Sequence, residues 1–288
     1  MLNESLRRMT SATPRQSSCP ICGASAQFAY DHPDSEIWRC TQCDHAFTHL
    51  ETLRVIEEYS ADYYDEEHKN WFENPHIALF EWIGNNIPSD AKSVFDIGCG
   101  RGDFLQHLHN THPGLELIGV DLSPNELAPG IEFIQQNVMD MEITRQYDVI
   151  VSLASIEHME DPLSFSKRLK ELCSPNGVIV VMTVNESGLL YTMARIARSL
   201  GFKSVFNRLY SAHHLNHFSV KSLRCLLETA GMEVQKVHQH NSPLAAVDLP
   251  KSLTPVRWLV LGAVAVVFAL GKVMSMCLSQ TVIARPKP

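Results

Sequence analysis

Residues 94–104, VFDIGCGRGDF, decide the fold class of this chain. A short apolar run ends in Asp96, and glycines follow at every second position, at 98, 100 and 102. An apolar run that closes on glycines is typical of a buried strand that turns into a helix. The stretch leaves three interpretations open: a dinucleotide cradle, a site for another adenine-bearing cofactor, or a tight turn without a ligand.

The order of acid and glycines argues against a dinucleotide cradle. Such a cradle reads G-x-G-x-x-G, and its helix N-terminus neutralises a pyrophosphate. Here the carboxylate of Asp96 precedes the glycines, which disfavours a pyrophosphate and suits a cation. A ligand with an ammonium and a sulfonium group would fit, and the glycines would let the backbone pass close to it. A second apolar run, LIGVDLS, ends in Asp121, where an acid can accept hydrogen bonds from both hydroxyls of a ribose.

From residue 91 onward, apolar runs alternate with helical patterns. The runs are SVFDIG, LELIGVDL, IEFIQQ, YDVIVSL and GVIVVMTV, and MEVQKVHQ and QTVIARP follow near the C-terminus. Several are apolar throughout, as expected of strands that are covered on both faces. The alternation of strands and helices predicts an α/β fold with a doubly wound, mostly parallel sheet. The helix after Asp121 is expected to be short, because SPNELAPG contains two prolines.

Two CxxC pairs near the N-terminus predict a zinc ribbon over residues 19–50. The ligands would be Cys19, Cys22, Cys40 and Cys43, and the spacing lets each turn offer two thiolates to one tetrahedral zinc ion. Four thiolates leave the ion no open position, so the site is expected to be structural rather than catalytic. Such an ion would staple a small unit that lacks a core of its own. Contact of the ribbon with a substrate or partner is the alternative.

Together these motifs resemble those of the class I S-adenosylmethionine (SAM) dependent methyltransferases, over residues 76–240 and the last strand. VFDIGCGRGDF resembles their first motif, GVDLS the ribose motif and FIQQNVMDM the adenine-side motif. The resemblance implies a Rossmann-like sheet of seven strands that binds SAM. The implied cofactor-binding residues are Asp96, Gly98, Gly100, Asp121, Leu122, Asn137 and Val138. The family often has Asp where this chain has Asn137, whose amide can still pair with an adenine edge.

The resemblance also implies how the chain is organised. A subgroup that acts on small molecules carries an N-terminal zinc ribbon followed by a Y-x-x-x-Y-Y-like segment, which YSADYY fits. The expected parts are a flexible tail (1–18), the zinc ribbon (19–50), a helical linker (51–90) and the methyltransferase domain (91–288), with a lid insertion at 186–218 and an apolar helix at 256–276.

Two histidines are candidates for a base that takes a proton from the methyl acceptor. His158 follows the fourth strand in SIEHMEDP, where members of the family often place residues that face the substrate, and His214 lies in HHLNHFS. Histidine suits this role because its pKa lies near working pH. Each histidine could instead hold its own loop in place. Catalysis by positioning alone would need no side-chain base.

The two apolar, basic segments suggest contact with a membrane surface. Residues 187–227 contain six bases and no acid, although the net charge of the chain is −8. Between Arg257 and Lys272 lie 14 uncharged residues, whereas a membrane span requires about 20. We therefore expect a helix that returns to the sheet and rests on the domain, on a partner or in a membrane interface. Segments 186–210 and 256–276 are the candidates for peripheral contact with anionic lipid.

These observations predict methyl transfer from SAM to a small or lipid-linked acceptor, with oxygen favoured over nitrogen and carbon. The basic lid would also suit a phosphate-bearing acceptor. The first twenty residues show no secretory pattern, so a cytoplasmic location is expected, with peripheral contact at the inner face of a membrane.

One alternative is an RNA base methyltransferase, but the acidic segment 51–73 and the absence of a basic, aromatic ribbon disfavour nucleic acid. The other alternative is a SAM-binding, membrane-associated scaffold without catalysis.

Overall fold

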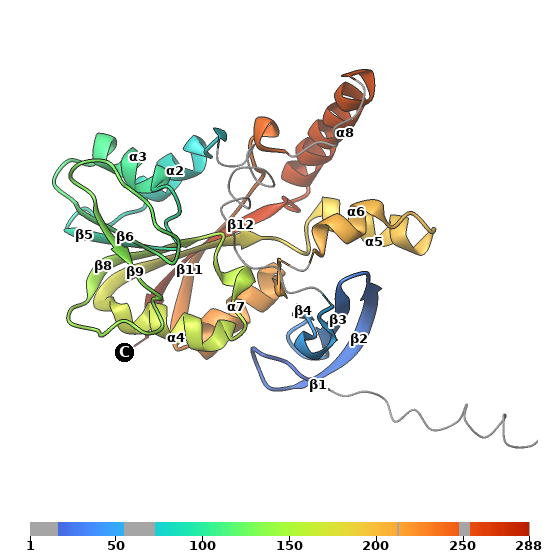
Figure 1. Ribbon diagram of the computed structural model, residues 1–288, viewed down its shortest axis with the longest axis horizontal. Coiled ribbons are helices and arrows are strands. Elements are labelled where there is room, and N and C mark those ends of the chain that lie inside the picture. Colours follow the sequence, from blue (N-terminus) through green and yellow to red (C-terminus); the bar gives the residue numbers. More distant parts are fainter. Residues whose placement is uncertain (1–16, 55–72, 212, 248–253, 288) are drawn as a thin grey trace, which may run out of the picture.

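Two sheets organise the chain in the computed structural model, which describes residues 17–54, 73–211, 213–247 and 254–287 (Figure 1). The expected tail lies outside the described residues except for its last two positions, and so does the YSADYY segment. The described part of the expected helical linker holds a short 3-10 turn, η2 (Leu50–Thr52), and helix α2 (Ile77–Gly84).

The larger sheet has seven strands in the order β11-β12-β9-β8-β5-β6-β7. The strands are β5 (Ser93–Ile97), β6 (Glu116–Asp121), β7 (Glu132–Gln135), β8 (Tyr147–Leu153), β9 (Cys173–Val184), β11 (Met232–His240) and β12 (Ser279–Pro286). Only β12 runs against the others in this sheet, between β9 and β11, and the remaining neighbours pair in parallel. The predicted Rossmann-like, mostly parallel sheet is confirmed.

Helices cover both faces of this sheet, which explains why its strands are apolar throughout. In β5, Val94 packs in one core with α2 and α3 (Asp103–Thr111), while Phe95 and Ile97 pack in the other. That second core includes α4 (Pro162–Leu172) and α7 (Val220–Thr229). Successive side chains of β5 thus enter opposite cores. The glycine turn follows the carboxyl end of this central strand, which is buried on both faces.

The connection between β6 and β7 contains no described helix. Residues 122–131 form bends and a turn, in agreement with the two prolines, Pro124 and Pro129. Leu127 from this connection packs against the glycine turn, because a Cβ built on Gly102 would lie 2.7 Å from its Cδ2. The short helix expected after Asp121 is therefore absent, and Leu127 of the coil in its place covers the glycine turn at Gly102.

The smaller, N-terminal sheet has five antiparallel strands in the order β1-β2-β3-β4-β10. Four come from the cysteine-rich segment, namely β1 (Ser17–Ser18), β2 (Ser25–His32), β3 (Ser35–Cys40) and β4 (Ala46–Thr48). The fifth, β10 (Asn216–His217), comes from the segment that precedes α7. We call residues 17–54 the ribbon. Its sheet is therefore completed by the main part of the chain.

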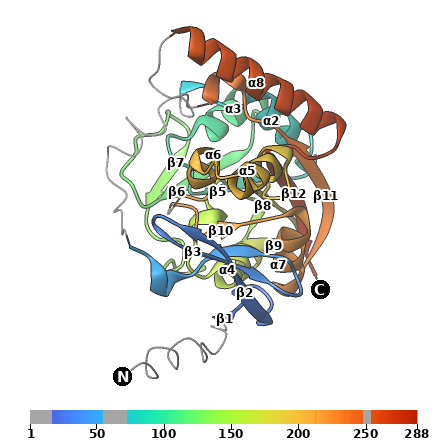
Figure 2. The ribbon, with the colours of Figure 1, turned by 90° about the vertical axis from the view of Figure 1, so that its right-hand side faces the viewer.

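Three further helices lie on the side of the sheet where β9 ends. They are α5 (Leu189–Ser199), α6 (Ser204–Leu209) and α8 (Thr254–Val273), and Figure 2 shows them on one face of the molecule. The last turn of α8 docks on α5, because the Leu189 N–H donates to the carbonyl of Met276, which follows α8, over 2.8 Å. We keep the name lid for the expected insertion, residues 186–218. Among the described residues, no helix is long and apolar enough to cross a membrane.

Candidate active site

The glycine turn joins β5 to α3 with three glycines in left-handed backbone conformations. Gly98, Gly100 and Gly102 have φ angles of 73°, 52° and 74°. A Cβ built on Gly98 would lie 2.3 Å from the Oγ of Ser155, in the loop after β8. Glycine is therefore required at this position both by conformation and by close approach. The turn presents its backbone where an extended ligand can lie along it.

Asp96 is the second-last residue of β5 and is buried, with 2% of its surface exposed. Its Oδ1 atom has no hydrogen-bond partner among the described residues. Burial raises the pKa of Asp96 to about 8, and the negative charge of Asp121 makes a smaller contribution in the same direction. A buried carboxylate that lacks a partner favours a cationic ligand group, because a positive charge would compensate its desolvation. This observation fits the ammonium group of SAM.

Asp121 ends β6 and faces the glycine turn. Its Oδ2 accepts from the Gly100 N–H over 2.9 Å, and its Oδ1 accepts from the Ser123 N–H over 2.9 Å. Each carboxylate oxygen has two lone-pair directions, so the group retains capacity for ribose hydroxyls. The next residue, Leu122, is exposed. Its carbonyl accepts from the Nε2 of Gln135 over 3.2 Å, so its side chain is the part that stays open to a cofactor.

The adenine-side residues lie after β7. Val138 is buried, whereas Asn137 is exposed and its Oδ1 accepts from the Met139 N–H over 3.0 Å. The amide of Asn137 is therefore engaged in a turn of its own backbone, and its amino group is the part available to adenine. The cofactor roles of these residues stay predictions, because nothing in the structure tests them directly.

A cavity of about 110 Å³ lies beside the glycine turn. Asp96, Gly98 and Gly100 line it on one side, and His76 at the start of α2 lines it from another element. Leu153 and Ala154, at the end of β8, also contribute. The cavity brings together the carboxylate and two of the glycines that the sequence assigned to the cofactor. Asp121 touches this region through Gly100 and is not part of the cavity wall.

The two candidate bases lie next to each other. The rings of His158, in the turn η4 (Ile156–His158), and of His214 are 5.1 Å apart. The Nδ1 of His158 lies 2.6 Å from the carbonyl oxygen of His213, which requires an Nδ1–H donor. The lone pair of this ring is consequently on Nε2, the tautomer that can act as a base through that atom.

Glu157 precedes His158 and is buried, and burial raises its pKa to about 7. Glu157, His158 and His214 bring ligand atoms within 4.8 Å of one another, so this group could also hold a metal ion. The sequence reasoning missed Glu157. Its position beside a candidate base in SIEHMEDP was the available signal.

The four predicted zinc ligands form one cluster. The Sγ atoms of Cys19 and Cys43 are 3.5 Å apart, and the Sγ of Cys22 lies 3.5 Å from that of Cys40 and 3.6 Å from that of Cys43. In a tetrahedron with Zn–S bonds of about 2.3 Å, the sulfurs are about 3.8 Å apart. The cluster fits a zinc ribbon with four thiolate ligands.

Comparison with known proteins decides the family. A profile described as a methyltransferase domain matches residues 58–237. The chain belongs to this family. The resemblance found in the glycine turn is thereby confirmed, and the match covers the main-sheet strands β5 to β9 and the first part of β11.

Curated relatives of this methyltransferase domain include O-methyltransferases of ubiquinone biosynthesis. The ubiquinone biosynthesis O-methyltransferase of Stutzerimonas stutzeri is 29% identical over 127 residues, which are 40% of this chain and 54% of that protein. The mitochondrial protein of the same name from Dictyostelium discoideum is 26% identical over 155 residues, 46% of this chain and 47% of that protein. The chain spans about half the length of these curated relatives.

Solved structures agree with the methyltransferase fold. The complex of the Haloferax volcanii Trm112 methyltransferase activator with a methyltransferase matches with a TM-score of 0.58, at 12% identity over 81% of this chain and 100% of that one. A Burkholderia thailandensis 1,6-didemethyltoxoflavin-N1-methyltransferase, solved with its substrate and S-adenosylhomocysteine, matches with a TM-score of 0.52, at 12% identity over 86% of this chain and 98% of that one. At these identities the likeness concerns the fold.

Proposed function

We propose that this chain is a SAM-dependent O-methyltransferase that acts on a small, lipid-linked acceptor. The observation that carries the cofactor assignment is the buried, unpartnered carboxylate of Asp96 beside the glycine turn. The choice of oxygen and of a lipid-linked acceptor is supported by relatives named as O-methyltransferases of ubiquinone biosynthesis.

Bound SAM would supply an electrophilic methyl group on a sulfonium. The chain's own task is then to hold the cofactor and to prepare the acceptor. Asp96 would hold the ammonium group and Asp121 the ribose. His158 would accept the proton of the acceptor hydroxyl on Nε2, because its Nδ1–H is directed to the carbonyl of His213. Removal of that proton makes the oxygen a better nucleophile as the new bond forms.

The direct test is methyl transfer from labelled SAM by the purified, zinc-loaded protein. The acceptors are hydroxylated aromatic rings with and without a polyprenyl tail, detected in the organic phase. Label in the tailed phenol supports the proposal. Saturable binding of S-adenosylhomocysteine without label in any acceptor would favour the scaffold interpretation, and label in RNA instead would favour the nucleic-acid alternative.

His158→Gln is expected to lower kcat by about 10² to 10⁴ fold, the usual contribution of a general base. The affinity for S-adenosylhomocysteine should stay within about twofold, because the contacts of Asp96 and Asp121 are unchanged. His214→Gln serves as the paired variant, since its ring lies 5.1 Å from that of His158. Full turnover in both variants would show that methyl transfer here needs no side-chain base. A loss of wild-type turnover on chelation, while one zinc ion per chain stays bound, would assign the histidines to a second metal ion.

We further propose that the lid and α8 rest on an anionic lipid surface. Leu200 and Phe202, between α5 and α6, are 71% and 73% exposed, and Trp258 and Leu259 at the start of α8 are 67% and 74% exposed. Along the chain, the exposed bases Lys203, Arg208 and Arg257 stand close to these apolar side chains, and residues 187–227 and 249–288 contain no acid. An apolar surface with basic sequence neighbours complements a bilayer with negative headgroups. Figure 2 shows α5, α6 and α8 on one face of the molecule.

The double variant Phe202→Ser/Trp258→Ser is expected to lose most of its flotation with vesicles that contain phosphatidylglycerol. Phe28→Ser is the matched control, because Phe28 is 52% exposed on β2, outside the lid and α8. Wild-type binding should weaken in vesicles of phosphatidylcholine alone and at high salt. Equal flotation of both variants, or no flotation of the wild type, would remove the membrane from the proposal.

A further inference from the structure

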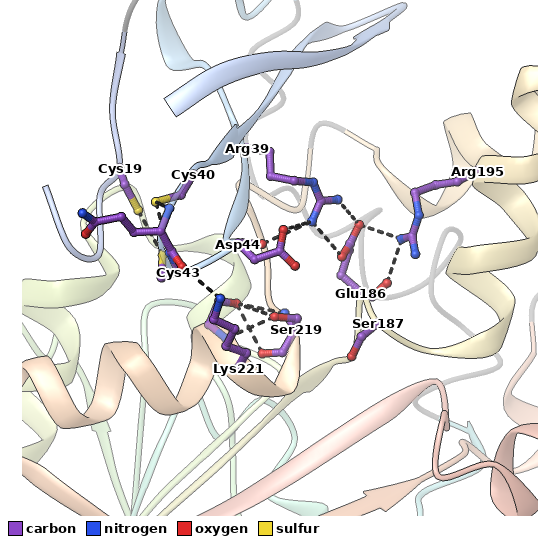
Figure 3. A network of polar contacts seen from close by, with 12 residues as sticks. Cys19, Arg39, Cys40, Cys43, Asp44, Glu186, Ser187, Arg195, Ser219 and Lys221 are labelled. Atoms are coloured by element: carbon purple, nitrogen blue, oxygen red, sulfur yellow. Dashed lines mark hydrogen bonds and ion pairs between the residues drawn. The ribbon is translucent and has the colours of Figure 1, made fainter. Parts of the chain in front are cut away.

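Glu186 is a buried carboxylate at the point where β9 leads into the lid. It is 2% exposed and accepts hydrogen bonds from three other parts of the chain, two of which, Arg39 and Arg195, are shown in Figure 3. Arg39 of β3, in the ribbon, approaches its Oε1 to 2.6 Å, and Arg195 of α5 approaches the same atom to 2.7 Å. The hydroxyl of Tyr210, after α6, donates to it as well. One carboxylate thus joins the ribbon to both helices of the lid.

A second connection runs through the backbone of the ribbon sheet. The Thr48 N–H of β4 donates to the carbonyl of Leu215 over 2.9 Å, and the Thr48 Oγ1 donates to the carbonyl of His214 over 3.2 Å. The pairing continues with Asn216 opposite Phe47. The edge of the ribbon therefore fixes the segment that carries the candidate base His214.

A third connection reaches the other candidate base through Asn216. Its Oδ1 accepts from the Nε2–H of His45 over 3.1 Å, and its Nδ2 donates to the carbonyl of Met159 over 2.6 Å. Met159 follows His158 directly in the chain. The ribbon is thus two hydrogen bonds from the backbone beside His158.

These polar links cross an interface that also has an apolar core. Ile37 and Ala46 of the ribbon pack with three buried aromatic side chains of the lid, which are Tyr191, Phe206 and Tyr210. Apolar packing thus already holds these two parts of the chain against each other. A buried arginine–carboxylate pair adds little stability compared with apolar residues of similar size, and its value lies in fixing geometry. The pair between Arg39 and Glu186 therefore points to positioning.

The cofactor half of the site is held by different contacts. Gly98 N–H and Cys99 N–H donate to the carbonyl of Val120 in β6 over 2.8 and 3.2 Å, and Gly100 N–H donates to Asp121. These contacts belong to the main sheet. The two halves meet at Ser155, whose Oγ donates to the carbonyl of Ile97 over 3.3 Å and whose carbonyl accepts from the His158 N–H over 3.1 Å. The contacts of the ribbon with Glu186 and Asn216 are a different set.

We infer that the ribbon is a positioning module for the acceptor half of the active site. Arg39, through Glu186, sets the lid, and Asn216, joined to β4, sets the loops of His158 and His214, while cofactor binding is independent of both. The expected effect on acceptor turnover rests on the proposed function. The expected effect on the order of the lid does not depend on the proposed function.

The test compares Arg39→Met with Arg54→Met in the full, zinc-loaded chain. Arg54 is the control because it also belongs to the ribbon, and its side chain contacts Asp31, His32 and Pro33, which lie within the ribbon itself. Hydrogen exchange of residues 186–218 should accelerate at least tenfold in Arg39→Met and stay unchanged in Arg54→Met. The Kd for S-adenosylhomocysteine should remain within twofold in both, whereas kcat/KM for the acceptor should fall at least tenfold in Arg39→Met alone.

Asn216→Ala is the second variant, because it cuts the link to Met159 without changing a ribbon residue. It should lower kcat and shift the pH profile of kcat with little change in zinc content. Unchanged exchange in the lid of Arg39→Met, at one zinc per chain, would overturn the inference. A wild type that neither binds S-adenosylhomocysteine nor methylates an acceptor would overturn the proposed function instead, and the exchange comparison would still decide the role of the ribbon.

Discussion

Asp96→Asn is expected to weaken the binding of S-adenosylhomocysteine about 100-fold, without lowering the stability of the protein in the absence of cofactor. Asparagine keeps the shape of the side chain and removes its charge. Loss of one partner of a buried charge pair costs about 2 to 5 kcal/mol of binding free energy, and a 100-fold loss corresponds to about 2.7 kcal/mol. Isothermal titration calorimetry measures the change.

The pH dependence should change together with the affinity. Burial raises the pKa of Asp96 from 3.8 to about 8 in the folded chain without cofactor. The folded state therefore keeps a proton that the unfolded chain has lost, so this group destabilises the fold increasingly as pH rises from about 4 to about 8. The Tm of Asp96→Asn at pH 8 should equal or exceed that of the wild type. Unfolding could then not explain the loss of binding.

The cofactor's ammonium group should expel that proton on binding. Wild-type affinity is accordingly expected to rise between pH 6 and pH 8, and the binding enthalpy at pH 7 to differ between phosphate and Tris buffers. Both effects should vanish in Asp96→Asn. Asp90→Asn, at an exposed carboxylate before β5, is the control and should behave as the wild type. Affinity within threefold of the wild type in Asp96→Asn would contradict the ammonium assignment.

Removal of zinc is expected to unfold the ribbon and leave the main sheet folded. The purified chain should contain one zinc ion, and Cys40→Ser should contain almost none. Structural zinc sites supply about 10 to 16 kcal/mol of apparent binding free energy in small domains. The sheet β1 to β4 is too small to persist without that contribution. Elemental analysis gives the metal content, and hydrogen exchange of residues 25–48 reports the unfolding.

Cys225→Ser is the matched control for this prediction. Cys225 is half-buried on α7 and lies outside the thiolate cluster. Its replacement should leave both zinc content and exchange in the ribbon unchanged. A metal-free preparation that keeps slow exchange in β2 and β3 would show that the ribbon folds on its own packing.

The parts that the sequence predicted correctly depend on local patterns. Asp96 and the alternate glycines identified the strand–turn–helix unit, and the two CxxC pairs identified the thiolate cluster. The two prolines predicted a short helix after Asp121, whereas residues 122–131 contain none. Each of these signals lies within about a dozen residues or repeats a known spacing. The last two strands were also located, since each carries its own apolar pattern.

The parts that were missed depend on contacts between distant residues. Nothing local in NESG indicates that Glu186 would meet Arg39 and Arg195, and a two-residue strand such as β10 has no periodicity to detect. The engagement of Asn137 with its own backbone follows from the turn it adopts. The exposure of Trp258 and Leu259 depends on where the C-terminal end of α8 docks. Sequence patterns report local conformation, and these features are set by tertiary packing.

The pairing of β4 with β10 also has a consequence for the order of folding. Thr48 and His214, which this pairing joins, are 166 residues apart in the chain. Closing so long a loop is entropically costly until the intervening sheet has formed, and such distant contacts arise late. We expect the thiolate cluster and the main sheet to form first and independently, and the two to dock in a final, slower step. The half of the active site that holds the cofactor would thus exist before the half that carries His158 and His214.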